Sequence, residues 1–249
     1  MKLVTQYLLS FLFIVQMYVM MALFATLGIP LALLGGRAGA VRVVRAYCHW
    51  VRWSARVMVG LRSEIRGEVP AGDVLVCAKH QSFFDIILIM SALPQGRFIM
   101  KKELRFTPFV GWYAKWIRCI PVDRGKKGAA IKAMIAALRA DDQGGQLIIF
   151  PQGTRVAAGV RQPYKVGAAV LYDEMKLPCV PVAVNVGVFW PRHGILRKPG
   201  LAVAEFLPPI APGLEARAFL ETLETRIETN SDRLMAEAGL IVPPASPAT

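Results

Sequence analysis

A histidine and an aspartate lie five residues apart in the stretch KHQSFFD, residues 79–85. On one regular helix five residues turn through roughly 140°, which would point the two side chains apart. If His80 instead lies in a turn just before a helix and Asp85 in the first helical turn, the carboxylate can reach back to the imidazole. An imidazole is the usual general base near neutral pH, so that geometry would predict proton transfer by His80. The alternative is that both side chains have hydrogen-bond partners in the fold and take no part in a reaction.

Two arginines follow apolar, strand-like runs and have a glycine close by. Arg124 directly precedes Gly125, and Arg155 comes two positions after Gly153. Glycine lets the backbone approach an anion closely, and a guanidinium holds a phosphate with two parallel hydrogen bonds. We expect both arginines to bind a phosphate group, with solvated surface charges as the alternative.

The elements that must position these residues alternate between β-type runs and helical stretches. Strands are expected at 74–78, 98–100, 119–122, 147–150, 180–186 and 201–206. Helices are expected at 85–93, 108–117, 127–140, 166–175 and 213–238. The alternation predicts an α/β sheet covered by helices. Functional groups of such sheets gather where strands end, so one imidazole and two arginines are expected at the same edge.

The first 62 residues have a different character from the rest of the chain. They contain no Asp or Glu and seven Lys or Arg residues, so they hold +7 of the formal charge of +13. Residues 7–34 carry no charge and are more numerous than the roughly 20 that cross a bilayer. We expect a membrane helix from about Leu3 to Ile29, a break at Pro30 and Gly35-Gly36, and a second helix over residues 38–61 at the headgroup level.

Two membrane topologies fit this pattern. One is a single span followed by an interfacial helix, and the other is a helical hairpin dipped into one leaflet. The arginines place the chain after residue 37 on the cytoplasmic side, which predicts attachment to the cytoplasmic face of the inner (plasma) membrane. A secretory signal peptide is disfavoured because its apolar region should span only about 7–15 residues.

Several other classes of protein have little support. Four cysteines without CxxC spacing indicate buried thiols in a reducing compartment. Three histidines and no acidic cluster give no basis for a metal site. Nucleic-acid binding is disfavoured because the densest basic section adjoins the apolar segment and no recognition motif appears. A non-enzymatic, basic membrane-binding protein is the weaker alternative to an enzyme.

Four blocks in this order resemble the glycerolipid acyltransferase family, in particular the 1-acyl-glycerol-3-phosphate acyltransferases: KHQSFFD (79–85), IPVDRG (120–125), FPQGTR (150–155) and VPVAVN (180–185). Residues 101–112 and 165–168 also look like segments of that family. The resemblance implies a mixed, mostly parallel sheet. It also implies acyl transfer from acyl-CoA or acyl-carrier protein to the free sn-2 hydroxyl of lysophosphatidic acid, giving phosphatidic acid for membrane phospholipid synthesis, with no cofactor.

The resemblance also implies roles for particular residues. His80 would take the proton from the acceptor hydroxyl, and Asp85 would hold the imidazole tautomer, as in a Ser-His-Asp triad. The acceptor phosphate would be bound by Arg124 and Arg155, with Lys101 as a further candidate, and Gly153 and Thr154 would also belong to the substrate-binding site. The expected domains are a membrane-binding segment (1–62), an acyltransferase domain (63–240) and a flexible tail (241–249).

Two positions depart from the common family pattern. Gln152 stands where many members have Glu, and Lys79 stands where many have Asn. Gln keeps the hydrogen-bonding shape but cannot act as a base, which leaves open another acceptor, such as a lyso-ornithine lipid or another lysophospholipid. Lys79 is expected either to act electrostatically on the neighbouring histidine or to attract the anionic thioester carrier.

Overall fold

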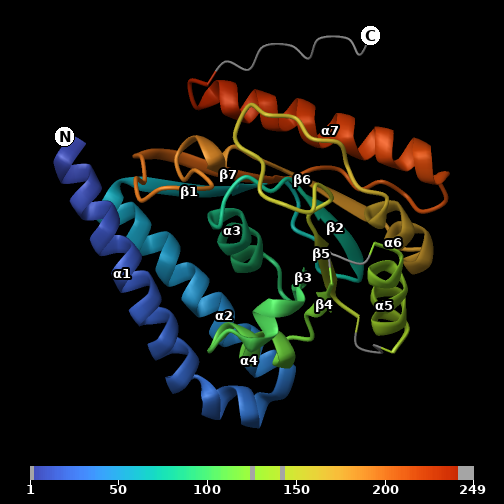
Figure 1. The fold of residues 1–249 in the computed structure, drawn as a ribbon, viewed down its shortest axis with the longest axis horizontal. Coiled ribbons are helices and arrows are strands. Elements are labelled where there is room, and N and C mark those ends of the chain that lie inside the picture. The colour runs from blue at the N-terminus through green and yellow to red at the C-terminus, as the bar shows by residue number, and fades with distance from the viewer. Residues whose placement is uncertain (1–2, 124–126, 141–143, 241–249) are drawn as a thin grey trace.

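The computed structural model describes residues 3–123, 127–140 and 144–240. A seven-stranded sheet in the order β1-β7-β6-β2-β5-β3-β4 forms its centre (Figure 1). All neighbouring strands are parallel except β6 and β7, which are antiparallel. The expected mixed, mostly parallel α/β sheet is therefore confirmed. The strands are β1 (Leu61–Arg66), β2 (Val74–Ala78), β3 (Arg97–Lys101), β4 (Ile120–Val122), β5 (Gln146–Ile149), β6 (Cys179–Val184) and β7 (Gly200–Phe206).

Helices cover both faces of this sheet. Successive strand residues point to opposite faces, so Leu75 and Cys77 pack with α6 (Gly167–Met175) and α7 (Ala216–Glu237), whereas Val76 and Ala78 pack with α1 (Leu3–Leu27), α2 (Ile29–Val59) and α3 (Phe84–Ala92). A strand buried on both faces appears in the sequence as an unbroken apolar run, which explains why β2, β5 and β6 were predictable. The helices beyond the N-terminal pair are α3 (Phe84–Ala92), α4 (Val110–Trp116), α5 (Lys127–Arg139), α6 (Gly167–Met175) and α7 (Ala216–Glu237), with 3-10 turns η1 (Lys102–Phe106) and η2 (Val186–Val188).

The N-terminal helices α1 (Leu3–Leu27) and α2 (Ile29–Val59) form an antiparallel hairpin (Figure 1). The chain turns at Gly28, where an added Cβ would lie 2.6 Å from the carbonyl oxygen of Phe24. The first helix was expected to end near Ile29 and ends at Leu27, and the break expected at Gly35-Gly36 corresponds to the non-helical Gly36 inside α2. Only the position of Pro30 differs from expectation, because α2 begins before it. Proline stands in the first turn of α2, where its missing N–H is not needed, and the helix is only kinked at Gly36 (φ 54°).

Strand β1 was missed because its sequence is mostly polar. The second helix was expected to reach Leu61, but Gly60 ends it in a left-handed conformation (φ 72°). The next six residues pair with β7 at the edge of the sheet, where only Leu61 is fully buried. A strand with so little apolar surface gives no pattern to detect.

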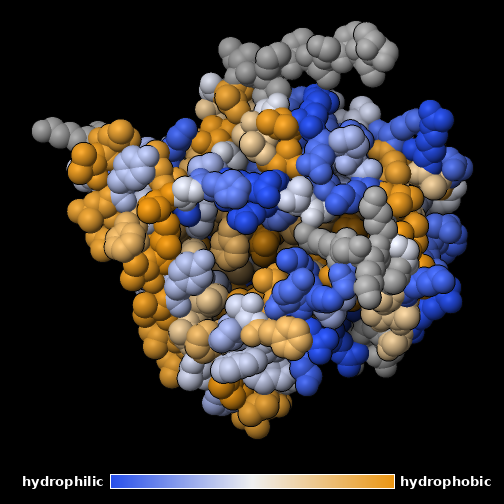
Figure 2. All heavy atoms as spheres, viewed as in Figure 1, coloured by the Kyte–Doolittle hydropathy of each residue, from blue (hydrophilic) through white to orange (hydrophobic). Residues whose placement is uncertain are grey.

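The hairpin presents an apolar outer face along α1. The helix is long and apolar enough to cross a membrane, with a mean hydropathy of 2.2 in its most apolar window. An apolar band follows the edge of the molecule where α1 lies (Figures 1 and 2). The large apolar side chains exposed on this helix are Leu3, Val4, Tyr7, Leu8, Phe11, Leu12, Val15, Tyr18, Val19, Leu23 and Leu27.

The inner face of α1 binds the rest of the protein through polar groups. Gln6 Nε2 donates to the carbonyl oxygens of Val59 (3.1 Å) and Arg197 (2.6 Å). Ser10 Oγ accepts from the backbone N–H of Arg197 at 2.9 Å. A helix fastened in this way along its own domain is half of a hairpin rather than an isolated span. The two helices pair with each other in the fold, and whether they span the membrane or enter one leaflet stays a prediction.

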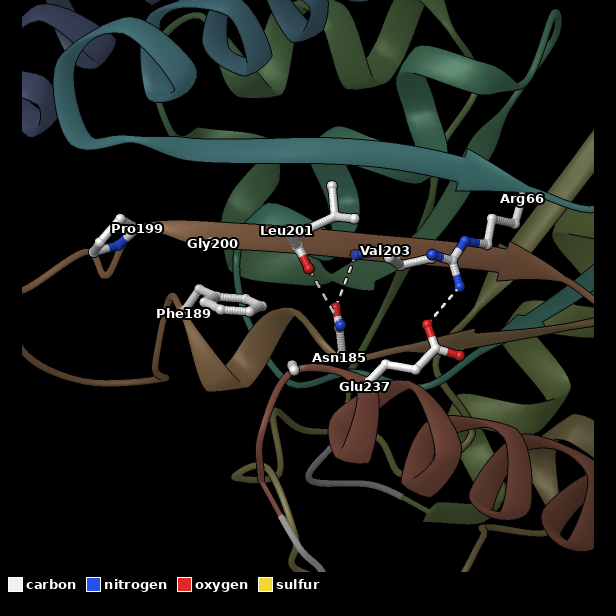
Figure 3. A pocket seen from close by; sticks show the side chains of 9 residues that line it. Arg66, Asn185, Phe189, Pro199, Gly200, Leu201, Val203 and Glu237 are labelled. Atoms are coloured by element: carbon white, nitrogen blue, oxygen red, sulfur yellow. Dashed lines mark hydrogen bonds and ion pairs between the residues drawn. The ribbon is translucent and has the colours of Figure 1, made fainter.

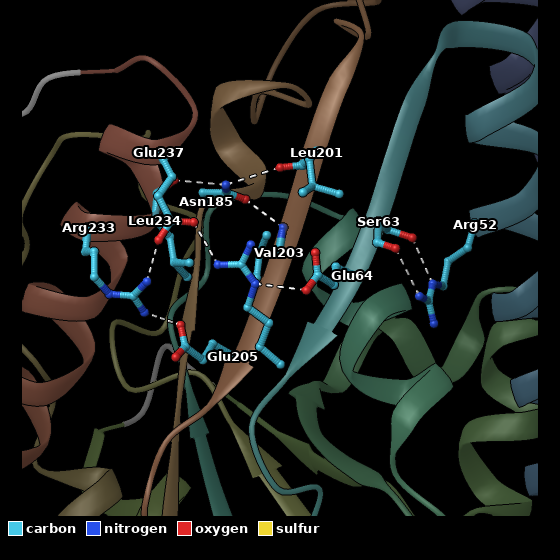
Figure 4. A network of polar contacts seen from close by, with 11 residues as sticks. Arg52, Ser63, Glu64, Asn185, Leu201, Val203, Glu205, Arg233, Leu234 and Glu237 are labelled. Atoms are coloured by element: carbon cyan, nitrogen blue, oxygen red, sulfur yellow. Dashed lines mark hydrogen bonds and ion pairs between the residues drawn. The ribbon is translucent and has the colours of Figure 1, made fainter.

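Two arginines of α2, Arg45 and Arg52, contact residues of α3 and β1. Arg52 Nε donates to Ser63 Oγ at 2.9 Å, and its Nη1 donates to Ser91 Oγ at 3.0 Å; Figure 4 shows the contact with Ser63. Arg45 donates to the Ser91 carbonyl at 3.3 Å. These two guanidiniums therefore fix α2 to α3 and β1 and are not free for lipid headgroups, whereas Arg42 and Arg56 are exposed.

Candidate active site

His80 lies two residues beyond the end of β2, and Asp85 lies in the first turn of α3. The carboxylate reaches back, as the turn-then-helix geometry requires. Its Oδ2 atom is 3.1 Å from His80 Nδ1 and accepts the backbone N–H groups of Gln81 (2.6 Å) and Ser82 (2.7 Å). Asp85 is fully buried. Because a carboxylate accepts hydrogen bonds, this contact places the proton of a neutral imidazole on Nδ1 and leaves Nε2 with its lone pair.

The imidazole is also held by the strand-end segment of β5. Its ring stacks on Phe150 with a centroid distance of 3.9 Å and an interplanar angle of 17°. The carbonyl oxygen of His80 accepts the N–H of Val156 at 2.7 Å. The His80 side chain keeps 13% of its surface exposed. The ring is therefore fixed in orientation yet accessible at one edge.

A cavity of about 560 Å³ opens beside His80. Figure 2 shows a hollow in the viewed face, with hydrophobic atoms in its depth and hydrophilic atoms along its rim. Arg155 and Lys101 line it together with His80. The remaining lining is mostly apolar and comes from the hairpin, α3, β3, η1 and α4, including Tyr18, Phe24, Val43, Tyr47, Ile86, Met90, Met100, Leu104, Val110 and Ile117.

Only some of the predicted binding residues line the cavity beside His80 in the part of the chain that the structure describes. Arg155 and Lys101 share the cavity with His80. Gly153 and Thr154 lie in the turn just before Arg155, where Gly153 has a φ of 70° that favours glycine. Arg124 lies outside the described residues. Groups of three or more His, Cys, Asp or Glu side chains that could hold a metal ion do not occur within the described ranges.

Lys79 does not approach the cavity, contrary to expectation. Its side chain is 1% exposed, and Nζ donates to Glu228 Oε2 of α7 at 2.5 Å. The other carboxylate oxygen, Oε1, accepts the Tyr164 hydroxyl at 2.9 Å. Adjacent residues of an extended segment point to opposite sides, so the lysine before the histidine points toward α7. It is therefore not available to attract an anionic carrier.

Gln152 is likewise turned inward. It is fully buried, and its Oε1 atom accepts the backbone N–H of His80 at 3.4 Å. Its Nε2 has no hydrogen-bond partner among the described residues. The amide thus contacts the backbone of His80 and is not among the residues that line the cavity. Sequence reasoning weighed Gln152 as an acceptor contact and did not single out Phe150, whose only signal was its place at the end of an apolar run.

A second, smaller pocket of about 350 Å³ lies between β7 and the end of α7 (Figure 3). Asn185, from the fourth block, lines it and is satisfied structurally: its Oδ1 accepts the N–H of Val203 at 2.7 Å, and its Nδ2 donates to Leu201 and Leu234 carbonyls. Arg66 pairs there with Glu237 at 2.7 Å (Figure 3). This pocket contains none of the predicted site residues.

Comparison with known proteins gives consistent results. The sequence model of the acyltransferase family matches residues 61–185. A 1-acyl-sn-glycerol-3-phosphate acyltransferase of Pseudomonas aeruginosa is 31% identical over 201 residues, covering 78% of this chain and 77% of that protein. One from Saccharomyces cerevisiae is 29% identical over 164 residues, covering 63% and 54%. The crystal structure of the 1-acyl-sn-glycerophosphate (LPA) acyltransferase PlsC from Thermotoga maritima superimposes with a TM-score of 0.80 at 21% identity, covering 95% of this chain and all of that one.

Proposed function

Since the chain belongs to the acyltransferase family, we propose that it transfers a fatty acyl group to the free sn-2 hydroxyl of lysophosphatidic acid, giving phosphatidic acid. The proposal is supported by relatives named for that activity, with the first covering most of the chain. The observation that carries the chemistry is His80: its Nδ1 is bound to buried Asp85 while its ring edge meets an apolar cavity. A donor thioester of CoA or acyl-carrier protein completes the reaction.

The proposed transfer needs no nucleophile from the protein. His80 Nε2 takes the proton of the acceptor hydroxyl as its oxygen attacks the thioester carbonyl. A new C–O bond forms, the C–S bond breaks, and the departing thiolate takes the proton back from the imidazolium. Asp85 holds Nδ1–H throughout and stabilises the imidazolium. Arg155, which lines the cavity, binds the acceptor phosphate, and the sequence offers Arg124 as a further candidate.

The cavity and the hairpin suit two lipid substrates. Apolar side chains of α1 and α2 line the cavity opposite His80, so acyl chains would lie against the hairpin. The exposed apolar face of α1 would hold the enzyme in the membrane, with the α/β domain on the cytoplasmic face. Substrates could then reach His80 without leaving the lipid phase.

The test is turnover in mixed micelles with a panel of lysolipids and both donors. Wild-type protein should acylate lysophosphatidic acid, and His80→Ala should lower kcat by about 10²–10⁴-fold while vesicle binding persists. Acylation by His80→Ala at the wild-type rate would exclude His80 as the base. Turnover only with a phosphate-free acceptor, such as a lyso-ornithine lipid, would overturn the phosphatidate assignment.

A further inference from the structure

We propose that Lys165 is a further ligand of the acceptor phosphate and sets the preference for phosphate-bearing acceptors; this rests on the acyl transfer proposed above. Its side chain lies over the turn that precedes Arg155. A Cβ added at Gly153 would lie 2.7 Å from Lys165 Nζ and 3.0 Å from its Cε atom. The ammonium group therefore occupies the space left by the glycine of the FPQGTR block.

The backbone of Lys165 is fixed from both sides. Its N–H donates to the carbonyl oxygen of Pro151 at 2.9 Å, which joins it to the start of the same turn. The preceding residue, Tyr164, is buried, and its hydroxyl donates to Glu228. Glu228 in turn pairs with Lys79, the residue before His80. The segment that carries Lys165 therefore contacts the turn before Arg155 directly. It also contacts the residue before His80 through Tyr164 and Glu228.

The two cations beside this turn, Lys165 and Arg155, come from separate segments of the chain. Lys165 and Arg155 make no ion pair within the described part of the chain, although nearby Arg161 pairs with Asp232. Arg192 donates to the Arg155 carbonyl at 3.0 Å and adds a third cation beside the turn. A phosphate monoester carries close to two negative charges near pH 7, so two cations from separate segments match its charge. Charge-assisted hydrogen bonds of this kind discriminate strongly against an uncharged headgroup.

The experiment measures KM and kcat for lysophosphatidic acid with Lys165→Met and Lys165→Arg. Lys165 is exposed, so both variants should fold. We expect Lys165→Met to raise the KM about tenfold with kcat within about threefold of wild type, because a remote binding contact is lost. The Ki of glycerol 3-phosphate as a competitor should rise by a similar factor. Lys165→Arg keeps the charge and should stay within about threefold of wild type.

The matched control is Lys132→Met, which removes an exposed lysine from α5. It should leave the KM and the Ki unchanged. The proposal is overturned if Lys165→Met keeps the wild-type KM, if Lys165→Arg is impaired as severely, or if Lys132→Met shows the same shift. Failure of the proposed function has a different signature: the wild-type protein itself would leave lysophosphatidic acid unacylated.

Discussion

At the scale of single residues, the Oδ2 atom of Asp85 accepts hydrogen bonds from both the candidate base and the turn that carries it. Asp85 Oδ2 accepts the imidazole N–H and two backbone N–H groups, so the same carboxylate fixes the turn and the tautomer. The backbone contacts would tolerate a neutral acceptor, whereas stabilisation of an imidazolium requires negative charge. A substitution of Asp85 can therefore remove the negative charge while keeping the hydrogen bonds that hold the turn.

Asp85→Asn should lower kcat by about a hundredfold or more, with the KM for the acceptor nearly unchanged, because the amide oxygen can hold the turn but not the imidazolium. Initial rates with lysophosphatidic acid test this. Asp232→Asn, which only disrupts the exposed pair with Arg161, is the control and should keep wild-type kcat. Equal losses in the two variants would contradict a specific role for Asp85.

At the scale of elements, the hairpin divides its side chains between lipid and protein. Phe11 is 52% exposed on the outer face of α1, whereas Phe13 is fully buried and packs edge-on against Trp190 at a centroid distance of 5.5 Å. The two residues lie on the same helix but face different surroundings. They form a natural pair for testing membrane attachment separately from folding.

Phe11→Ser should weaken partitioning into lipid vesicles while leaving the unfolding temperature unchanged, because it removes apolar surface only from the outer face. Phe13→Ala should lower the free energy of unfolding by about 3–5 kcal/mol through the cavity it leaves. Vesicle flotation and unfolding in detergent measure the two effects. If Phe11→Ser destabilised the fold as much as Phe13→Ala, α1 would be packed on both faces.

Helix α7 carries a second glutamate, Glu224, close to the buried Glu228. Burial, followed by the charge of Glu228, raises the pKa of Glu224. A carboxyl whose pKa is raised in the folded state contributes stability below its unfolded pKa and loses it as pH rises through the folded value. Glu224→Gln should therefore raise Tm relative to wild type at pH 8, and the gain should shrink toward pH 4.

Thermal unfolding across this pH range measures the effect. Glu221→Gln, on the exposed side of the same helix, should change the free energy of unfolding by less than about 0.5 kcal/mol at each pH. A gain for Glu224→Gln that is equally large at pH 4 and pH 8 would show that the carboxylate is not the cause.

At the scale of the whole molecule, a buried ion pair joins two residues that lie 149 positions apart in the sequence. Lys79 follows β2, and Glu228 lies on α7, with side-chain exposures of 1% and 2%. Such a pair is weak evidence for stability by itself, because desolvation offsets the attraction. Removing one partner, however, leaves an uncompensated buried charge.

Lys79→Met should therefore lower the free energy of unfolding by about 3–5 kcal/mol, and the double variant Lys79→Met/Glu228→Met should recover most of that loss. Chemical unfolding of the single and double variants gives the coupling energy. Arg161→Met, which disrupts an exposed pair, should cost less than about 1 kcal/mol. Additive losses at Lys79 and Glu228 would contradict the pairing.

The sequence by itself determined the α/β class, six of the strands and the strand ends at which His80 and Arg155 lie, because buried parallel strands appear as apolar runs and carry functional groups at their carboxyl ends. The acyltransferase resemblance, drawn from four ordered blocks, is confirmed by the match over residues 61–185. The roles of the individual site residues, the acyl donor and the division at residue 62 stay predictions.

Only the tertiary structure decided where side chains near those strand ends point. Lys79 turns toward a partner 149 positions later, and Gln6 fastens α1 to a carbonyl 191 positions away. Local spacing contains no signal for such contacts, since they depend on which helix covers which face of the sheet. The same packing places His80 against Phe150 and brings Lys165 over Gly153. The pattern of residues thus predicted which strand ends carry the candidate site, and long-range packing decided which side chains lie next to one another there.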